Sequence, residues 1–213
     1  MNKYKKIVSI AATAVMCVAP MSVYAQEAQT DVIEAVAEKK QDTESSSVPV
    51  LQKEGIEISE GTGYDLSKEP GAATVKALEQ GTIVISYKTT SENAIQSLLS
   101  VGNGTKGNQD RHFHLYITNA GGVGMELRNT DGEFKYTLDC PAAVRGSYKG
   151  ERVSNTVALK ADKENKQYKL FANGELIATL DQEAFKFISD ITGVDNVMLG
   201  GTMRQGTVAY PFG

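Results

Sequence analysis

The sequence predicts an all-β fold, an antiparallel β-sandwich, for residues 51–213. From Gly55 onward, short runs of alternating apolar and polar residues are separated by turn residues, which is typical of strands with one buried face. The same region has no long amphipathic helical pattern and no internal repeat. The chain of 213 residues is long enough for one domain of ordinary size with shorter segments beside it.

The expected strands are the short alternating runs between these turn residues. They cover Gly81–Thr89, Ile95–Val101, Arg111–Thr118, Val123–Asn129, Phe134–Cys140, Thr156–Ala161, Gln167–Ala172, Glu175–Leu180 and Asn196–Gly201. One or two helical turns are expected over Gln182–Ile188.

Alternation along three of these runs assigns side chains to a core face and a polar face, because successive side chains of a strand point to opposite sides. The predicted polar, solvent-facing side carries His112, His114, Tyr116, Glu126 and Arg128. We expect the two histidines to be a surface pair rather than a metal site, because no third ligand is evident. Cys140 falls on the core face, so a buried, unreactive thiol is expected there.

Turn chemistry predicts how the strands pair. Asp131-Gly132 suits a two-residue type I′ hairpin, which sets Leu127 opposite Tyr136 and Met125 opposite Leu138. Both pairs join core-facing residues, so this register is consistent with the alternation.

The turn before it is expected to be a three-residue loop, Ala120-Gly121-Gly122, because a two-residue loop would set Tyr116 opposite a core residue. The odd loop sets Tyr116 opposite Glu126 and His114 opposite Arg128. These side chains then form one amphipathic surface with paired charges. A solvated sheet face with an ordinary Arg–Glu pair remains an equal alternative from the pattern alone.

The first 25 residues resemble a secretory signal peptide. Lys3, Lys5 and Lys6 form a basic start, Ile7–Ala19 is an apolar run too short to span a membrane, and cleavage is expected after Ala25. Residues 26–50 are acidic, then Ser-rich, and lack aromatic residues, so a linker is expected there. The protein should therefore be secreted or displayed on the cell surface, with no membrane span in the mature chain.

Composition excludes several function classes. The net charge of -4 and the pI near 5.3 argue against nucleic acid or an anionic membrane as the main partner. Two cysteines, one of them within the predicted signal peptide, do not suggest a disulfide framework.

Three segments carry a family resemblance: residues 157–162, the run Gln167–Leu176 with its Asn-Gly turn, and Asn196–Thr202. They resemble the laminin-G or concanavalin-A-like jelly-roll sandwich. Together with Glu126-Leu-Arg128 and the stretch 203–212, they are similar to the sialic-acid-binding module at the N-terminus of bacterial sialidases, carbohydrate-binding module family 40. The likeness covers residues 50–213.

The resemblance implies a sugar site in which two arginines hold the sialic acid carboxylate, an acidic residue orients an arginine or accepts from the sugar, and aromatic and apolar side chains form the walls. The matching positions are Arg128 and Arg204 for the carboxylate, Glu126 as the acidic partner, and Tyr116, Tyr210 and Ile95 as the walls. The chemistry agrees, because a guanidinium matches a carboxylate bidentately and Lys does not.

The resemblance also implies a non-catalytic role. The module would bind sialylated glycans, such as mucin or glycoprotein termini, and target a sialidase catalytic domain encoded downstream. Catalytic propellers of sialidases carry Asp boxes that end in Trp, and this chain has no Trp. No cofactor is expected, and the use of a structural calcium is open. The family pattern normally continues into a closing strand, so we expect an uncovered sheet edge near the termini.

The second function class is a laminin-G-like adhesin that binds protein or matrix without specificity for sialic acid. The resemblance favours the lectin, and the alternation pattern by itself does not discriminate between the two classes.

Overall fold

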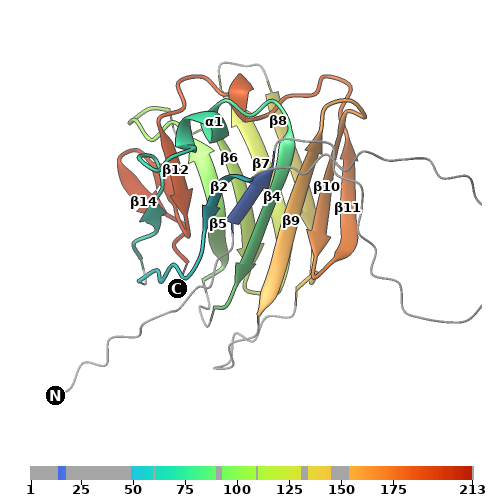
Figure 1. The fold of residues 1–213 in the computed structure, drawn as a ribbon, viewed down its shortest axis with the longest axis horizontal. Coiled ribbons are helices and arrows are strands. Elements are labelled where there is room, and N and C mark those ends of the chain that lie inside the picture. The colour runs from blue at the N-terminus through green and yellow to red at the C-terminus, as the bar shows by residue number, and fades with distance from the viewer. Residues whose placement is uncertain are drawn as a thin grey trace, which may run out of the picture.

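The computed structural model describes residues 14–17, 49–59, 61–89, 93–108, 110–130, 134–144 and 154–212, with 14–17 and 49–50 described by their backbone alone. They form two six-stranded antiparallel sheets that face each other, as Figure 1 shows. The fold is therefore the β-sandwich that the alternation predicts.

The first sheet has the strand order β11-β10-β9-β4-β1-β2. Its members are β1 (Ala14–Cys17), β2 (Pro49–Lys53), β4 (Gly81–Tyr87), β9 (Asn155–Asp162), β10 (Gln167–Ala172) and β11 (Glu175–Asp181). In Figure 1 this sheet lies towards the viewer.

The second sheet has the order β3-β12-β5-β6-β7-β8. Its members are β3 (Tyr64–Asp65), β5 (Ile95–Gly102), β6 (His112–Thr118), β7 (Val123–Asn129), β8 (Phe134–Cys140) and β12 (Asn196–Leu199). A separate hairpin of β13 (Thr202–Arg204) and β14 (Thr207–Ala209) follows β12.

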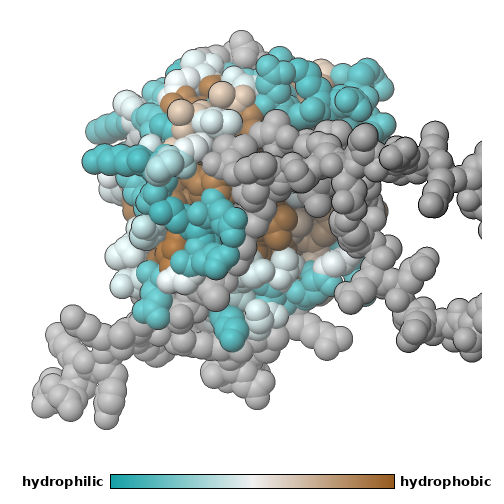
Figure 2. Space-filling model, in the orientation of Figure 1, coloured by the Kyte–Doolittle hydropathy of each residue, from teal (hydrophilic) through white to brown (hydrophobic). Residues whose placement is uncertain are grey.

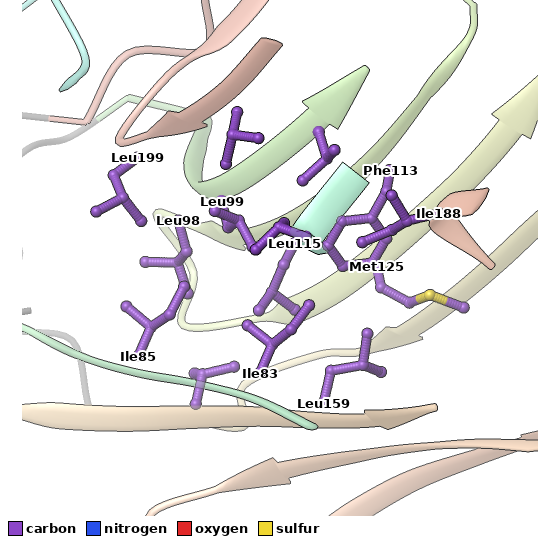
Figure 3. Close-up of a cluster of buried hydrophobic side chains, with 14 of the residues drawn as sticks. Ile83, Ile85, Leu98, Leu99, Phe113, Leu115, Met125, Leu159, Ile188 and Leu199 are labelled. Atoms are coloured by element: carbon purple, nitrogen blue, oxygen red, sulfur yellow. The ribbon is translucent and has the colours of Figure 1, made fainter. Parts of the chain in front are cut away.

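The core lies between the sheets. Ile83 and Leu159 from the first sheet approach Leu115 and Met125 from the second, as Figure 3 shows. Their side chains have no more than 2 % of their surface exposed. Burial of such side chains, about 1.5–3 kcal/mol each, is the main force that holds the two sheets together.

The outside of the first sheet is mixed in character. On the part of this face that is not drawn in grey, Figure 2 shows hydrophobic residues as small brown areas among hydrophilic ones. Along β4 the residues alternate between buried and half-buried, as expected of a strand with one face on the core.

Two short helical segments close one end of the sandwich. Helix α1 (Ala72–Lys76) was not anticipated from the sequence, and it buries Ala72 and Val75. The predicted helical turns over Gln182–Ile188 are wrong, because the described helical turn there is the 3-10 segment Ile188–Asp190. Residues 182–187 are not helical. Within them, the Phe185 ring stacks on the Tyr168 ring at 4.8 Å. None of the helices in the described parts of the chain has the length and apolar character needed to cross a membrane.

The register of β7 and β8 confirms the hairpin prediction. Leu127 pairs with Tyr136 and Met125 pairs with Leu138. The Asp131-Gly132 turn that predicts this register lies outside the described residues.

The register of β6 and β7 corrects the other prediction. Tyr116 lies opposite Gly124, not Glu126, and His114 lies opposite Glu126, not Arg128. The three-residue loop is placed one position earlier than expected, so the pairing slips by two residues and side chains keep their face. The reason is local: Gly121 takes the left-handed φ of 79°, and the Gly122 N–H donates to Oγ1 of Thr118 at 2.9 Å.

Strand β1 lies between β2 and β4 and pairs antiparallel with both. Its residues fall within the predicted signal peptide. While residues 14–17 are part of the chain, β1 pairs with the edge of β4, and β2 is the outermost strand on this side of the sheet. The uncovered edge expected near the termini stays a prediction. Cleavage after Ala25 stays a prediction, because residue 25 and most of the predicted linker lie outside the described residues; Pro49 and Val50 already belong to β2.

Candidate ligand-binding site

The candidate site lies on the outer face of the second sheet, the face turned away from the core. Strand β6 places His112, His114 and Tyr116 on this face, and β7 places Glu126 and Arg128 beside them. The predicted alternation is confirmed, but the predicted exposure is wrong for the histidines. His112 and His114 are 5 % and 3 % exposed, so they are not a surface pair.

The hairpin β13–β14 helps to enclose this face. Oγ of Ser97 and Oγ of Ser100 donate to the Gly201 carbonyl at 3.1 and 3.0 Å, which ties the start of the hairpin to β5. The hairpin turns at Gln205-Gly206, where φ values of 52° and 78° are those of a type I′ turn. Arg204, directly before the turn, is thereby brought over the sheet.

Arg128 and Arg204 come together through one carboxylate, that of Asp110. Nη1 of Arg128 lies 3.2 Å from Oδ1 of Asp110, and Nη2 of Arg204 lies 3.5 Å from the same oxygen. The side chains of Arg128 and Arg204 are 27 % and 26 % exposed, so both remain accessible from solvent. We call Arg128 and Arg204 the arginine pair.

Glu126 anchors Arg128, the member of the arginine pair that lies on β7. Its Oε1 lies 3.1 Å from Nη1 of Arg128, and its Oε2 lies 3.6 Å from Nε2 of His112. The hydrogen bond from His112 holds the pKa of Glu126 below its usual range, opposed by burial and assisted by the charge of Arg128. Glu126 is therefore a carboxylate at neutral pH and can accept hydrogen bonds.

Aromatic rings lie next to the charged groups. The His114 ring stacks on Tyr210 at 5.5 Å and lies 5.0 Å from the Tyr116 ring. Burial, together with the charge of nearby His112, lowers the pKa of His114 to about 3, so the ring is neutral. Nη1 of Arg204 donates to the Tyr210 hydroxyl at 2.9 Å, which joins the aromatic rings to the arginine pair.

Tyr116 is held across β7 by β8. Its hydroxyl donates to Oδ1 of Asp139, and the ring passes over Gly124 between them. A Cβ on Gly124 would lie 2.5 Å from Cζ of Tyr116, so glycine is needed for this path. Burial, then the bond to Asp139, raises the pKa of Tyr116, which stays a neutral hydroxyl.

Tyr210 takes its place through the backbone. Its φ of 50° is left-handed, which is unusual for a residue with a Cβ. Its carbonyl accepts from the Ser97 N–H at 2.9 Å, and Phe212, two residues on, is fully buried against Tyr87 at 5.7 Å. The buried Phe212 and the Ser97 bond together turn the Tyr210 ring towards His114.

Ile95 begins β5 on the same face, opposite Thr118 and two residues before Ser97. A cavity of about 290 Å³ opens beside Arg128 at the far end of β7 and β8. Its lining residues are Arg128, Asn129, Thr130, Phe134 and Lys135.

The structure therefore brings five of the six predicted residues into one connected group: Arg128, Arg204, Glu126, Tyr116 and Tyr210. Ile95 shares their face at its edge. Sequence reasoning missed Asp110 and Asp139, the carboxylates that hold the arginine pair and Tyr116. Asp110 lies in a turn, where alternation gives no signal. Asp139 does follow the alternation of β8, which places it on this face.

Other chemistry has less support. Within the described residues, no three His, Cys, Asp or Glu side chains gather in a way that could hold a metal ion. Cys140, the last residue of β8, was expected to be buried and is partly exposed.

A β-sandwich with an arginine pair and aromatic rings on one sheet face is a domain suited to bind an anionic ligand. The family model of the sialidase N-terminal domain matches residues 49–213, and the chain belongs to that family. It corresponds to the N-terminal domain of these proteins and not to their catalytic domain.

Known relatives agree with this assignment. The chain is 65 % identical to an anhydrosialidase of the leech Macrobdella decora over 198 residues, which are 90 % of this chain and 26 % of the relative. A solved structure of the CBM40 domain of a Ruminococcus gnavus IT-sialidase is 97 % identical, with a TM-score of 0.73 over 77 % of this chain and 86 % of that one. A related structure, 96 % identical over the same shares with the same TM-score of 0.73, has that domain bound to alpha2,3 sialyllactose.

The chain spans about a quarter or less of the length of the curated relatives it matches, 26 % of the leech protein and 19 % of sialidase B from Streptococcus pneumoniae.

Proposed function

We propose that this chain binds terminal sialic acid on glycans and thereby targets a sialidase catalytic domain of the protein to which it belongs. The observation that carries the proposal is the convergence of Arg128 and Arg204 on one carboxylate oxygen, that of Asp110. Two guanidinium groups held side by side on one sheet face can donate together to the carboxylate of an anionic sugar. The 96 % identical domain bound to sialyllactose supports the same ligand class.

Each part of the site has a role in this proposal. The arginine pair donates to the sialic acid carboxylate, and ionised Glu126 accepts from sugar N–H or O–H groups. The rings of Tyr116 and Tyr210, with Ile95 at the edge, pack against apolar parts of the sugar. The proposed binding needs no cofactor, because side-chain donors and acceptors of the chain itself contact the sugar.

Affinity for a single sugar should be weak. A ligand of about 20 heavy atoms at about 0.3 kcal/mol each gives a Kd of tens of micromolar at best, and an open sheet face should give less. Weak binding is useful for a tethered domain, since it raises the local concentration of an attached enzyme on dense glycans. We propose mucin and glycoprotein termini as the glycans and an extracellular or cell-surface location for the encounter.

The test is titration with sialyllactose and with lactose, followed by calorimetry or NMR. Binding to sialyllactose with little or none to lactose is expected. Equal binding to both sugars, or binding to neither, would remove the proposed function and leave a protein-binding adhesin as the better description.

A further inference from the structure

Among the residues that the structure describes, Asp110 is the carboxylate that contacts both members of the arginine pair. It lies in the turn just before β6, and its side chain is 27 % exposed. Arg128 comes from β7 and Arg204 from the hairpin, so the two guanidinium groups belong to segments far apart in the chain. Oδ1 of Asp110 is the atom at which they meet.

Two cations held this closely repel each other. Because both nitrogens lie within 3.5 Å of one oxygen, they are within about 7 Å of each other. A negative charge between them offsets the repulsion and keeps both side chains over the sheet. Glu126 lies 3.1 Å from Arg128, whereas Arg204 forms its ion pair with Asp110.

The contacts of Arg128 leave N–H donors of its guanidinium group available for a ligand. The ionic contacts of Arg128 with Asp110 and Glu126 both use Nη1. The other terminal nitrogen of that guanidinium can therefore serve a ligand carboxylate while Nη1 stays anchored.

We infer that Asp110 is a positioning residue for the arginine pair: it fixes both guanidinium groups for a ligand carboxylate without contacting the sugar itself. This inference rests on the proposed function, and it explains why Arg128 and Arg204 lie side by side in the site. The competing possibility is that Asp110 occupies the place of the ligand carboxylate and must be displaced, in which case its removal would strengthen binding.

Titration of the full chain with sialyllactose separates the two. For Asp110→Ala we expect about a tenfold loss of affinity, and for Asp110→Asn a smaller loss, because the amide oxygen still accepts but carries no charge. Asp181→Asn is the matched control, since Asp181 lies in β11 of the other sheet, and it should leave the affinity unchanged. Unchanged or tighter binding by Asp110→Ala overturns the inference.

A second measurement needs no ligand. The side-chain Nε–H signals of Arg128 and Arg204 in the NMR spectrum, assigned with Arg128→Lys and Arg204→Lys, should both shift and exchange several-fold faster in Asp110→Ala. A merely structural role for Asp110 would not select these two arginines. If wild-type protein fails to bind sialyllactose but both arginine signals respond, the proposed function fails while the positioning role stands; if neither signal responds, the positioning role fails.

Discussion

Arg128 and Arg204 each present a planar fork of donors, and the value of the pair lies in its geometry as much as in its charge. Replacing either by Ala should weaken sialyllactose binding about 10–150-fold, because each loses charge-assisted hydrogen bonds of about 1.5–3 kcal/mol. Arg204→Lys should recover little, since the ammonium lacks the fork. Calorimetry would measure the change. Lys169→Ala, in β10 of the other sheet, is the control cation and should bind as wild type.

His114 makes stability depend on pH. Its pKa is lowered to about 3 in the fold, against about 6.5 in the unfolded chain, so between these values the unfolded state binds the extra proton. Stability should therefore rise with pH over this window, by up to about 1.4 kcal/mol per pH unit from this group. Urea unfolding at pH 5–6.5 avoids most carboxylate titration. His114→Phe keeps a ring against Tyr210 and should flatten the slope; an unchanged slope would contradict the assignment.

Neighbouring side chains leave no room for a Cβ atom at position 124, so glycine is needed there. Gly124→Ala should destabilise the domain by about 1–3 kcal/mol, because the added methyl collides with the Tyr116 ring and Asp139. Urea unfolding would measure the loss. In a chain that already carries Tyr116→Ala the same substitution should cost less, since the ring is gone. Equal costs in both backgrounds would show that the ring does not lie over position 124.

At the scale of elements, the hairpin β13–β14 sets the position of Arg204. Gly206→Ala should lower stability by about 1–2 kcal/mol, because Gly206 has a φ of 78° and no atom lies within 4 Å of an added Cβ, so the cost is backbone strain alone. Gln205→Asn should act in the opposite direction, since Asn-Gly is a favoured type I′ sequence. Affinity for sialyllactose should fall in Gly206→Ala and rise slightly in Gln205→Asn, because the hairpin positions Arg204. Thermal unfolding would measure the change in stability and titration the change in affinity. If Gly206→Ala and Gln205→Asn changed stability in the same direction, the prediction would be wrong.

Elements also show what the sequence could and could not predict. Strands β7, β8 and β10 have the predicted bounds, because their alternation is clean and their turns are rich in Gly and Asn. The β6–β7 register could not be predicted fully, because Gly121 and Gly122 can both take the left-handed place in the loop. The burial of His114 was missed, because its cover, Tyr210, lies 96 positions away in the chain.

At the scale of the molecule, the two sheets have separate tasks. A chain of residues 26–213 lacks β1, so β4 loses its pairing with residues 15–17. We expect a lower melting temperature, because the backbone groups of β2 and β4 lose their partners. Sialyllactose affinity should be unchanged, since the site lies on the other sheet. If the shortened chain lost as much affinity as Arg204→Ala does, ligand binding by the second sheet would depend on the pairing of β1 in the first.

The meeting of Arg128 and Arg204 also links recognition to folding. The two residues are neighbours only when the hairpin is docked on the second sheet, so an unfolded chain has no assembled site. A sugar that binds through both therefore stabilises the native state by mass action, by about 2.7 kcal/mol when its concentration is 100 times Kd. On a densely sialylated surface the domain is harder to unfold, and to degrade, than in free solution.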